Sequence, residues 1–258
     1  MLLFLLIGGY LFWQLRKSRG LLQVQNTALA ELNATKDKFF GIIAHDLRNP
    51  LSAFQGIGEQ LNFYLEKGDT AKLRFISTNI AKSATNLNGL LDNLLSWALM
   101  NRGMIPYQPE PLNVAQETTA NLAIHENAAQ AKSIQLENHI APDLQILADR
   151  NAFQAILRNM IANAIKFTHP GGRVCLTGEA KDGKVLIRIA DTGVGMAAEK
   201  LEKVFSLDKR SEHGTAGEKG AGLGLLLCKE LVALNNGAMT AESVVGAGST
   251  FTISLPQT

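Results

Sequence analysis

Helical periodicity over residues 22–102 constrains this chain more than any other feature. Two series of positions repeat seven residues apart, without Gly or Pro between residues 21 and 40: Leu22, Leu29, Lys36 and Ile43, then Gln25, Leu32, Phe39 and Asp46. This spacing is a heptad seam, imperfect at Gln25, Lys36 and Asp46. It predicts a helix that continues through Pro50, which removes one backbone hydrogen bond and kinks it, to a C-terminal cap near Gly68.

A second helix is predicted after Gly68, capped by Asp69 or Thr70 and ending near residues 101–103. Its apolar side chains recur at spacings of three and four: Leu73, Ile76, Ile80, Ala84, Leu87, Leu91, Leu94 and Leu95. Two helices of this kind expose a hydrophobic stripe that one hairpin cannot bury. We therefore expect an antiparallel helical hairpin that pairs with a second copy into a four-helix bundle, which makes the protein a homodimer.

The first 15 residues contain no charged side chain, and three basic residues follow, at positions 16, 17 and 19. A membrane-spanning helix needs about 20 apolar residues, so this run is somewhat short. We nevertheless predict an N-terminal membrane helix from this apolar run. Because basic residues flank the cytoplasmic end of a span, the remainder of the chain is predicted to lie in the cytoplasm. A short buried core helix is the alternative. We also expect that Met1 is not the natural start of the protein.

The C-terminal half has a different pattern, after a proline-containing linker at 104–112. Helices are predicted at 114–132, 150–167 and 223–235, and strands at 134–136, 144–147, 174–177, 185–189, 238–243 and 249–255. Strands and helices that do not strictly alternate predict an α/β sandwich, with one mixed sheet and helices on one face.

Composition excludes several classes of protein. The chain has 258 residues, with 25 Lys and Arg against 23 Asp and Glu, for a net charge of +2. This balance indicates no nucleic-acid partner. The two cysteines, Cys175 and Cys228, lie far apart in the sequence, which argues against a disulfide framework or a thiolate zinc site and favours reduced core thiols.

Two glycine clusters indicate a ligand that carries phosphate. Residues 191–195 (DTGVG) follow a predicted strand, and residues 220–224 (GAGLG) lead into a helix. Closely spaced glycines let backbone N–H groups approach an anion, and a helix N-terminus adds its positive end. The polar segment between the clusters has no periodicity and is typical of a mobile lid.

The predicted helix at 150–167 carries a polar face. Asn159, Asn163 and Lys166 follow one another at spacings of four and three, so they share one side of the helix. A carboxamide oxygen can bind Mg²⁺ and an ammonium can bind phosphate. An exposed polar stripe is the alternative.

These motifs resemble, in order, the boxes of bacterial sensor histidine kinases. The resemblance covers residues from about 22 to 256. It rests on the H box at 39–51, the N box at 159–167, the G1 box at 191–195, the F box at Phe205 with Leu207, the G2 box at 220–224 and the last glycine box at 246–251. Leu207 replaces the usual second Phe of the F box.

The resemblance implies a multidomain α and α/β protein. Its parts would be a transmembrane segment (1–16), a juxtamembrane coiled-coil linker (17–36), a dimerisation and histidine phosphotransfer domain (37–103), a linker (104–112) and a catalytic ATP-binding domain of the Bergerat type (113–258). It further implies ATP and Mg²⁺ as cofactors, a response regulator receiver domain as partner, and attachment to the inner membrane.

The resemblance also implies roles for individual residues. Asp191 would accept a hydrogen bond from the adenine amino group, supported through water by Thr250, and Phe167 would pack on the adenine plane. Asn163 would bind Mg²⁺. The full nucleotide-binding set is Asn159, Asn163, Lys166, Phe167, Asp191, Gly193, Gly195, Lys209, Arg210, Gly220, Gly222, Leu223, Gly224, Leu225 and Thr250.

The phosphoacceptor implied by the H box is His45. In the heptad register it lies at position c and points to solvent, where a neutral imidazole can attack phosphorus. By the resemblance, Asp46 would fix the imidazole tautomer and Asn49 would position water for phosphatase chemistry. The expected reaction is autophosphorylation of His45 followed by transfer to an aspartate of a response regulator. The alternatives are an ATP-binding scaffold, a phosphatase-dominant member of the same fold, or an ATPase related to chaperones and topoisomerases.

Overall fold

The computed structural model divides the chain into two units, Met1–Arg48 and Asn49–Thr258. It describes residues 13–14, 16–20, 22–23, 25–27, 30, 41, 47, 51–52, 54–101, 107–206, 213–218 and 224–258. The described residues between Trp13 and Ala30 are helical. Residues 1–12, which make up most of the predicted membrane span, lie outside the described set, as does half of the predicted coiled-coil linker at 17–36. Within the part of the chain that the structure describes, no helix is both long and apolar enough to cross a membrane.

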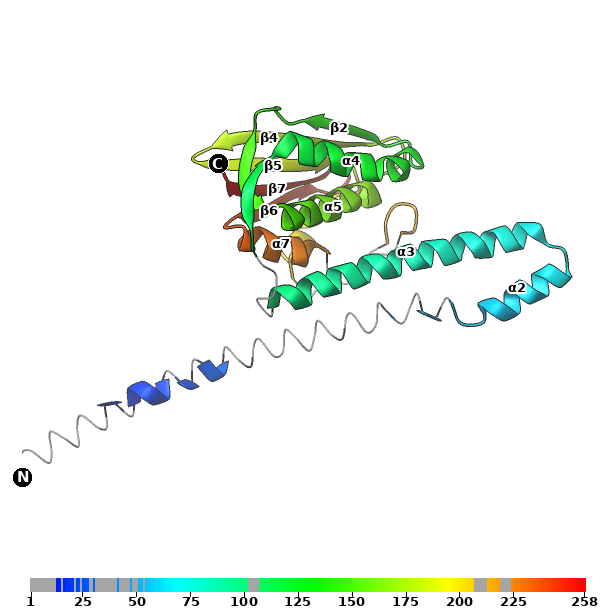
Figure 1. Ribbon diagram of the computed structural model, residues 1–258, viewed down its shortest axis with the longest axis horizontal. Helices are drawn as coiled ribbons and strands as arrows, with labels where there is room; N and C mark the ends of the chain where they lie inside the picture. Colours follow the sequence, from blue (N-terminus) through cyan, green and yellow to red (C-terminus); the bar gives the residue numbers. More distant parts are fainter. Residues whose placement is uncertain are drawn as a thin grey trace, which may run out of the picture. The chain divides into compact units, whose positions relative to one another are not determined.

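Two helices, α2 (Ile57–Glu66) and α3 (Thr70–Asn101), form an antiparallel hairpin joined by a short turn (Figure 1). Gly68 sits at the turn with φ of +66°, a conformation that glycine adopts without steric cost. Its N–H donates to the Leu65 carbonyl at 3.1 Å, and the Lys72 N–H donates to the Asp69 carboxylate at 3.0 Å. The predicted glycine cap and the predicted Asp69 cap are therefore both confirmed.

The predicted uninterrupted helix before this turn is wrong in one place. Residues 55 and 56 form a turn, and α2 begins only at Ile57. Gly56 adopts φ of +73°, in the left-handed region that ends a right-handed helix. The expected kink at Pro50 lies outside the described residues, whereas the break at Gly56 follows from the freedom of a residue without a side chain.

The C-terminal half contains a five-stranded mixed sheet in the order β2-β4-β5-β7-β6. Its strands are β2 (Gln135–His139), β4 (Arg173–Lys181), β5 (Lys184–Asp191), β6 (Ala238–Val244) and β7 (Gly248–Pro256). β2 pairs parallel to β4, and every other neighbouring pair is antiparallel. The β4–β5 hairpin turns at Asp182 and Gly183, both with positive φ, as the Asp-Gly pair predicts.

Three helices, α4 (Val114–Gln130), α5 (Arg150–Phe167) and α7 (Gly224–Leu234), lie along the sheet (Figure 1). Burial alternates along β5 and β7, which shows that one face of the sheet is covered and the other is more open. Asn113 caps α4 and Asp149 caps α5, each accepting a backbone N–H at 2.9 Å. The predicted mixed sheet with helices on one face is confirmed, except that the strand predicted at 144–147 does not belong to it.

Some elements escaped the sequence analysis. β1 (Pro109–Asn113) was not predicted, because residues 109–112 were expected to be linker. It pairs antiparallel with β3 (Gln145–Asp149), the strand predicted at 144–147, in a separate two-stranded sheet. A short helix, α6 (Ala198–Leu201), follows β5. Both cysteines are free thiols, but only Cys228 is a core residue, because Cys175 is half-buried on β4.

Candidate nucleotide site

Asp191, the last residue of β5, is a buried carboxylate at the end of the central strand. Its Oδ1 accepts hydrogen bonds from the backbone N–H groups of Gly193 at 2.9 Å and Ser249 at 3.3 Å. Burial raises the pKa of this carboxyl above its ordinary value, and the two N–H donors only partly offset the rise. Within the described part of the chain, Oδ2 accepts no hydrogen bond from protein, so it can accept one from a ligand.

Ser249, rather than Thr250, lies opposite Asp191. The register pairs Asp191 with Ser249 and Ala190 with Thr250. Because side chains alternate along a strand, Ser249 lies on the helix-covered face with Asp191, and Thr250 lies on the other face. Thr250, predicted to support the adenine contact through water, therefore lies on the face opposite to that of Asp191. The buried Ser249 hydroxyl also contacts the Ser243 hydroxyl at 3.0 Å.

The G1 turn packs tightly against the C-terminal end of α5. The Val194 N–H donates to the Phe167 carbonyl at 3.1 Å, and the Gly246 N–H donates to the Val194 carbonyl at 2.8 Å. A Cβ on Gly193 would collide with the Phe167 carbonyl oxygen, and a Cβ on Gly195 would collide with the backbone carbonyl of Val244. Because these two glycines have no side chain, the backbone segments around them can pack closely. This packing brings the N box, the G1 box and the last glycine box together.

The polar face of α5 is intact. Asn159, Asn163 and Lys166 are each half-buried along a helix whose other face supplies core residues. The Asn159 amide donates to the Ala155 carbonyl at 3.0 Å, and its Oδ1 would lie 2.6 Å from a Cβ on Gly224. The first residue of α7 therefore sits directly against Asn159. The Lys166 ammonium lies 4.6 Å from the centre of the Phe167 ring.

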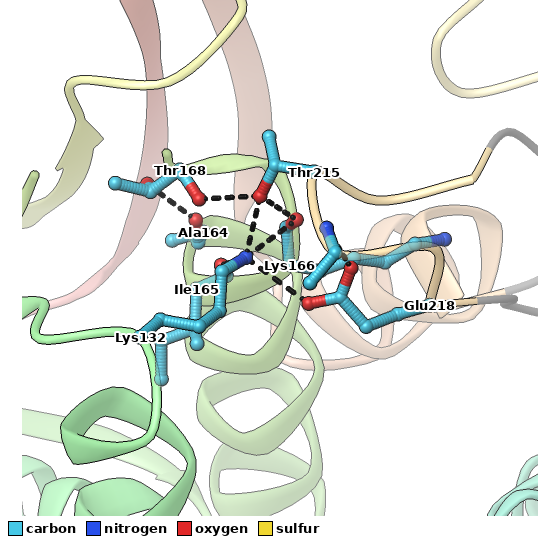
Figure 2. Close-up of polar contacts among 8 residues, drawn as sticks. Lys132, Ala164, Ile165, Lys166, Thr168, Thr215 and Glu218 are labelled. Carbon is cyan, nitrogen blue, oxygen red and sulfur yellow. Dashed lines mark hydrogen bonds and ion pairs between the residues drawn. The ribbon is translucent and has the colours of Figure 1, made fainter. Parts of the chain in front are cut away.

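One turn of the predicted lid, residues 213–218, is fastened to the end of α5 (Figure 2). The Thr215 N–H donates to the Lys166 carbonyl at 3.0 Å, and the Thr215 hydroxyl donates to the Thr168 carbonyl at 2.6 Å. We call residues 213–218 the anchored turn. The sequence predicted a mobile segment here, and no local pattern in it indicated this attachment.

Several predicted site residues lie outside the described part of the chain. They are His45, Asp46, Asn49, Lys209, Arg210, Gly220, Gly222 and Leu223. Gly224 and Leu225 are described and form the first turn of α7. In the F box, the Phe205 ring packs edge-on against Phe251, with centroids 6.3 Å apart, while Leu207 is outside the described set. The residues that the structure does bring together come from the N, G1 and last glycine boxes and from the start of α7.

Two family models match this chain. Residues 148–258 match the histidine kinase-, DNA gyrase B- and HSP90-like ATPase family. Residues 35–103 match the His Kinase A phospho-acceptor domain. The two matches occur in the order predicted from the sequence.

Known proteins give the same result. An uncharacterised sensor-like histidine kinase of Rhizobium meliloti is 31% identical over 227 residues, covering 87% of this chain and 43% of that protein. The histidine protein kinase DivJ of Caulobacter vibrioides is 29% identical over 226 residues, covering 87% and 38%. The crystal structure of full-length ShkA in complex with AMPPNP superposes with a TM-score of 0.60 at 26% identity, covering 86% of this chain and 46% of that one. The chain spans less than half the length of these curated relatives.

Proposed function

The chain belongs to the sensor histidine kinases of bacterial two-component systems, and we propose that it transfers the γ-phosphoryl group of ATP to His45. The observation that carries this proposal is the buried Asp191 carboxylate with an open Oδ2, beside the polar face of α5, in a chain whose residues 35–103 match a phosphoacceptor domain. A carboxylate in that position is the acceptor that an exocyclic amino group requires.

Adenine recognition falls to Asp191. Its Oδ1 is held by two backbone N–H groups, which fixes the direction of Oδ2. An adenine amino group donates to that oxygen, whereas the guanine carbonyl at the same position would meet it as a second acceptor. Ser249 supports the carboxylate through its backbone N–H. The Phe167 ring supplies an apolar face next to Lys166.

Cations and backbone N–H donors around α5 and α7 bind the phosphates in this proposal. Lys166 supplies a fixed charge, and the first turn of α7, with Gly224 and Leu225, presents N–H groups. Lys209 and Arg210 of the lid, and the backbone at Gly220, Gly222 and Leu223, complete the proposed set. Asn163, with Asn159 one turn before it, offers the carboxamide oxygen that would hold Mg²⁺. When bound, Mg²⁺ neutralises phosphate charge as it develops in phosphoryl transfer.

His45 is the proposed nucleophile. A ring nitrogen of the neutral imidazole forms a bond to the γ-phosphorus while the bond from that phosphorus to the β–γ bridging oxygen breaks, so ADP leaves with the electron pair. Asp46 accepts a hydrogen bond from the other ring nitrogen and takes up its proton as the ring acquires positive charge. The phosphoryl group then passes to an aspartate of a receiver domain, the second substrate in this proposal.

Assembly as a homodimer is part of the same proposal. Leu91 lies on the apolar face of α3 and is 44% exposed in the single chain, and Phe63 on α2 is 49% exposed. A second hairpin would cover such side chains in a four-helix bundle. Attachment to the inner membrane through residues 1–16 remains a proposal based on their apolar composition. Flotation of the full chain with liposomes, compared with a chain that starts at residue 17, tests it. Equal flotation of the two would rule out the anchor.

The activity is tested by incubating the full chain with γ-labelled ATP and Mg²⁺. We expect label that is stable in base and labile in acid, the behaviour of a phosphoramidate, and its transfer to an added receiver domain. Label that is stable in acid would contradict the proposal. So would the absence of any label on a protein that binds ATP. Calorimetric titration with ATP in the same buffer separates a failure to bind nucleotide from a failure to transfer phosphate.

A further inference from the structure

The ammonium of Lys132 is buried at the C-terminal end of α5, where it joins three segments of the chain. Lys132 lies in the connection between α4 and β2, and its side chain is 9% exposed. Its Nζ donates to four oxygens: the Ile165 carbonyl at 2.7 Å, the Lys166 carbonyl at 3.1 Å, the Thr215 hydroxyl at 2.6 Å and the Glu218 carboxylate at 3.0 Å. An ammonium has three protons, so this group is fully satisfied, with one proton shared.

Four oxygen acceptors around one buried site suit a compact cation that carries several N–H donors, such as the lysine ammonium. A buried ammonium is costly unless it is paired and hydrogen-bonded. Here the two carbonyls belong to the last turn of α5, where no N–H of the helix is available and the helix dipole is negative. Lys132 therefore caps the helix from outside, and the same cation reaches the anchored turn (Figure 2).

The anchored turn is itself closed around Glu218. The Ala216 N–H donates to Glu218 Oε2 at 2.8 Å, and the Gly214 N–H donates to the Glu218 carbonyl at 2.8 Å. Burial alone would raise the pKa of the Glu218 carboxyl, but hydrogen bonds from its own backbone, from Lys132 and from Ala216 outweigh it and lower the pKa below 4.5. Glu218 is thus an anion that holds both the turn and Lys132.

Gly214 shows how close this contact is. A Cβ at that position would lie 2.6 Å from Cγ of Lys166 and 2.7 Å from its carbonyl oxygen. The anchored turn therefore packs on the backbone and side-chain stem of the same lysine that the proposed function assigns to phosphate. This packing constrains the stem of Lys166, whose ammonium lies beside the Phe167 ring.

We propose that Lys132 is a positioning residue of the nucleotide site, because its ammonium fixes the anchored turn on the end of α5 and thereby orients Lys166 and Phe167. This inference rests on the proposed function for the identity of the ligand. Lys132 does not touch the nucleotide in this proposal and acts through Glu218, Thr215 and the two carbonyls. Nucleotide affinity should then depend on a lysine that lies outside every glycine box.

The test compares Lys132→Met, Glu218→Gln and Thr215→Val in the full chain, with Thr215→Ser as the conservative variant and Lys184→Met as the matched control. Lys184 is an exposed lysine at the start of β5. We expect the first three variants to raise the ATP dissociation constant and the KM for ATP about tenfold, the size of one lost charge-assisted hydrogen bond. Thr215→Ser and the control should stay within about twofold of wild type.

A second measurement separates positioning from general loss of structure. Transfer of phosphate from already labelled His45 to a receiver domain needs no ATP, so its rate should not change in any of the variants. Hydrogen exchange at the Thr215 and Ala216 amides should speed up in Lys132→Met and Glu218→Gln, while exchange in the sheet stays as in wild type.

Unchanged ATP affinity together with unchanged exchange at Thr215 in both variants would overturn the inference. So would equal loss of ATP affinity and sheet protection, because that would reduce Lys132 to a residue needed only for folding. If the wild-type chain binds ATP but never labels His45, the proposed kinase function fails, while ATP titration and hydrogen exchange still decide the role of Lys132.

Discussion

The helical hairpin and the ATP-binding domain differ in how far they bury their apolar side chains within the single chain. In the ATP-binding domain, Phe153, Ile161, Ile187 and Leu255 are all completely buried between sheet and helices. In the hairpin, no residue of α2 is buried, and Ile76 is the buried residue of α3 among those whose side chains are described. The domain carries a core of its own, whereas the hairpin needs further protein to complete one.

This difference has a functional consequence in a histidine kinase. In the proposed function, nucleotide binding belongs to a region that has a buried core in the single chain, and the phosphoacceptor belongs to a region whose core would be completed by assembly. Substitutions should therefore affect the two properties separately, since sites that share no partners have nearly additive effects.

The largest effect is expected from His45→Gln. Glutamine keeps a polar side chain of similar length but has no nucleophilic ring nitrogen, so labelling by γ-labelled ATP should be lost completely. ATP affinity should stay within about twofold of wild type, since no nucleotide contact is assigned to the hairpin. Acid-labile label that persists in the variant would show that another side chain is the phosphoacceptor.

Asp191→Asn should lower ATP affinity by about 100-fold, because the amide places an N–H₂ donor where the adenine amino group also donates. The same change should raise the relative affinity for GTP, whose base presents a carbonyl there. The fold should not suffer. The raised pKa of Asp191 means that its ionised form is disfavoured by burial, so stability is lost as the pH rises and ionises the group, and a neutral isostere avoids this cost. Calorimetric titration with both nucleotides and a thermal melt measure these outcomes; an unchanged ratio of ATP to GTP affinity would contradict the adenine role.

Asn49→Ala should act on a different reaction of the hairpin. Asn49 follows His45 by four residues, which is one turn of the helix predicted from the sequence, so its amide is proposed to hold a water in line with the phosphoaspartate of a docked receiver domain. If that water supplies a factor of ten to a hundred, its loss costs about 1.4 to 2.7 kcal/mol of transition-state stabilisation. Decay of purified phosphorylated receiver domain, with wild type or variant plus ADP, is the measurement. Equal decay rates would leave Asn49 as a structural helix residue.

Leu91→Lys should weaken dimerisation about tenfold, because a charge replaces an apolar side chain on the proposed bundle face. The melting of the ATP-binding domain should not change. Leu147, which is 38% exposed on β3, gives the matched control Leu147→Lys, for which no effect on the dimer is expected. Analytical ultracentrifugation over a range of concentrations measures both. If Leu91→Lys and its control behave alike, the exposed stripe of α3 is not the dimer face.

The two regions also differ in how far the sequence determined them. The cap at Asp69 was predicted because the signal is local: one side chain satisfies a backbone group a few residues away. The caps at Asn113 and Asp149 follow the same rule, and the turn at Gly183 follows from an equally local Asp-Gly pair. The order of boxes identified the family. For the hairpin, the break at Gly56 was missed because periodicity does not report which glycine interrupts a helix.

What the sequence could not provide depends on register and on long-range contacts. Ser249 faces Asp191 only because β5 and β7 pair in one register, and a shift by one residue would have placed Thr250 there instead. The contact between Lys132 and Glu218 joins residues that are 86 positions apart. No local sequence pattern predicts a contact over such a separation. The sequence around Lys132 therefore did not indicate that it would contact Glu218.

The smallest expected effect concerns the pH dependence of that contact. The lowered pKa of Glu218 means that its contribution to the anchored turn is fully present above the ordinary value of 4.5 and is lost only as the pH falls through the lowered folded value. Lys132 is the charged group paired with it, and the Lys166 stem packs on Gly214 of the same turn. Protection of the Thr215 amide, corrected for the intrinsic pH dependence of exchange, should therefore be flat from about pH 8 to about pH 5 and fall a few-fold below about pH 4.5. In Glu218→Gln the low-pH fall should disappear. If protection falls by the same amount in Glu218→Gln, another group causes the pH dependence. The electrostatic part of the contact between the domain and its anchored turn would then not come from Glu218.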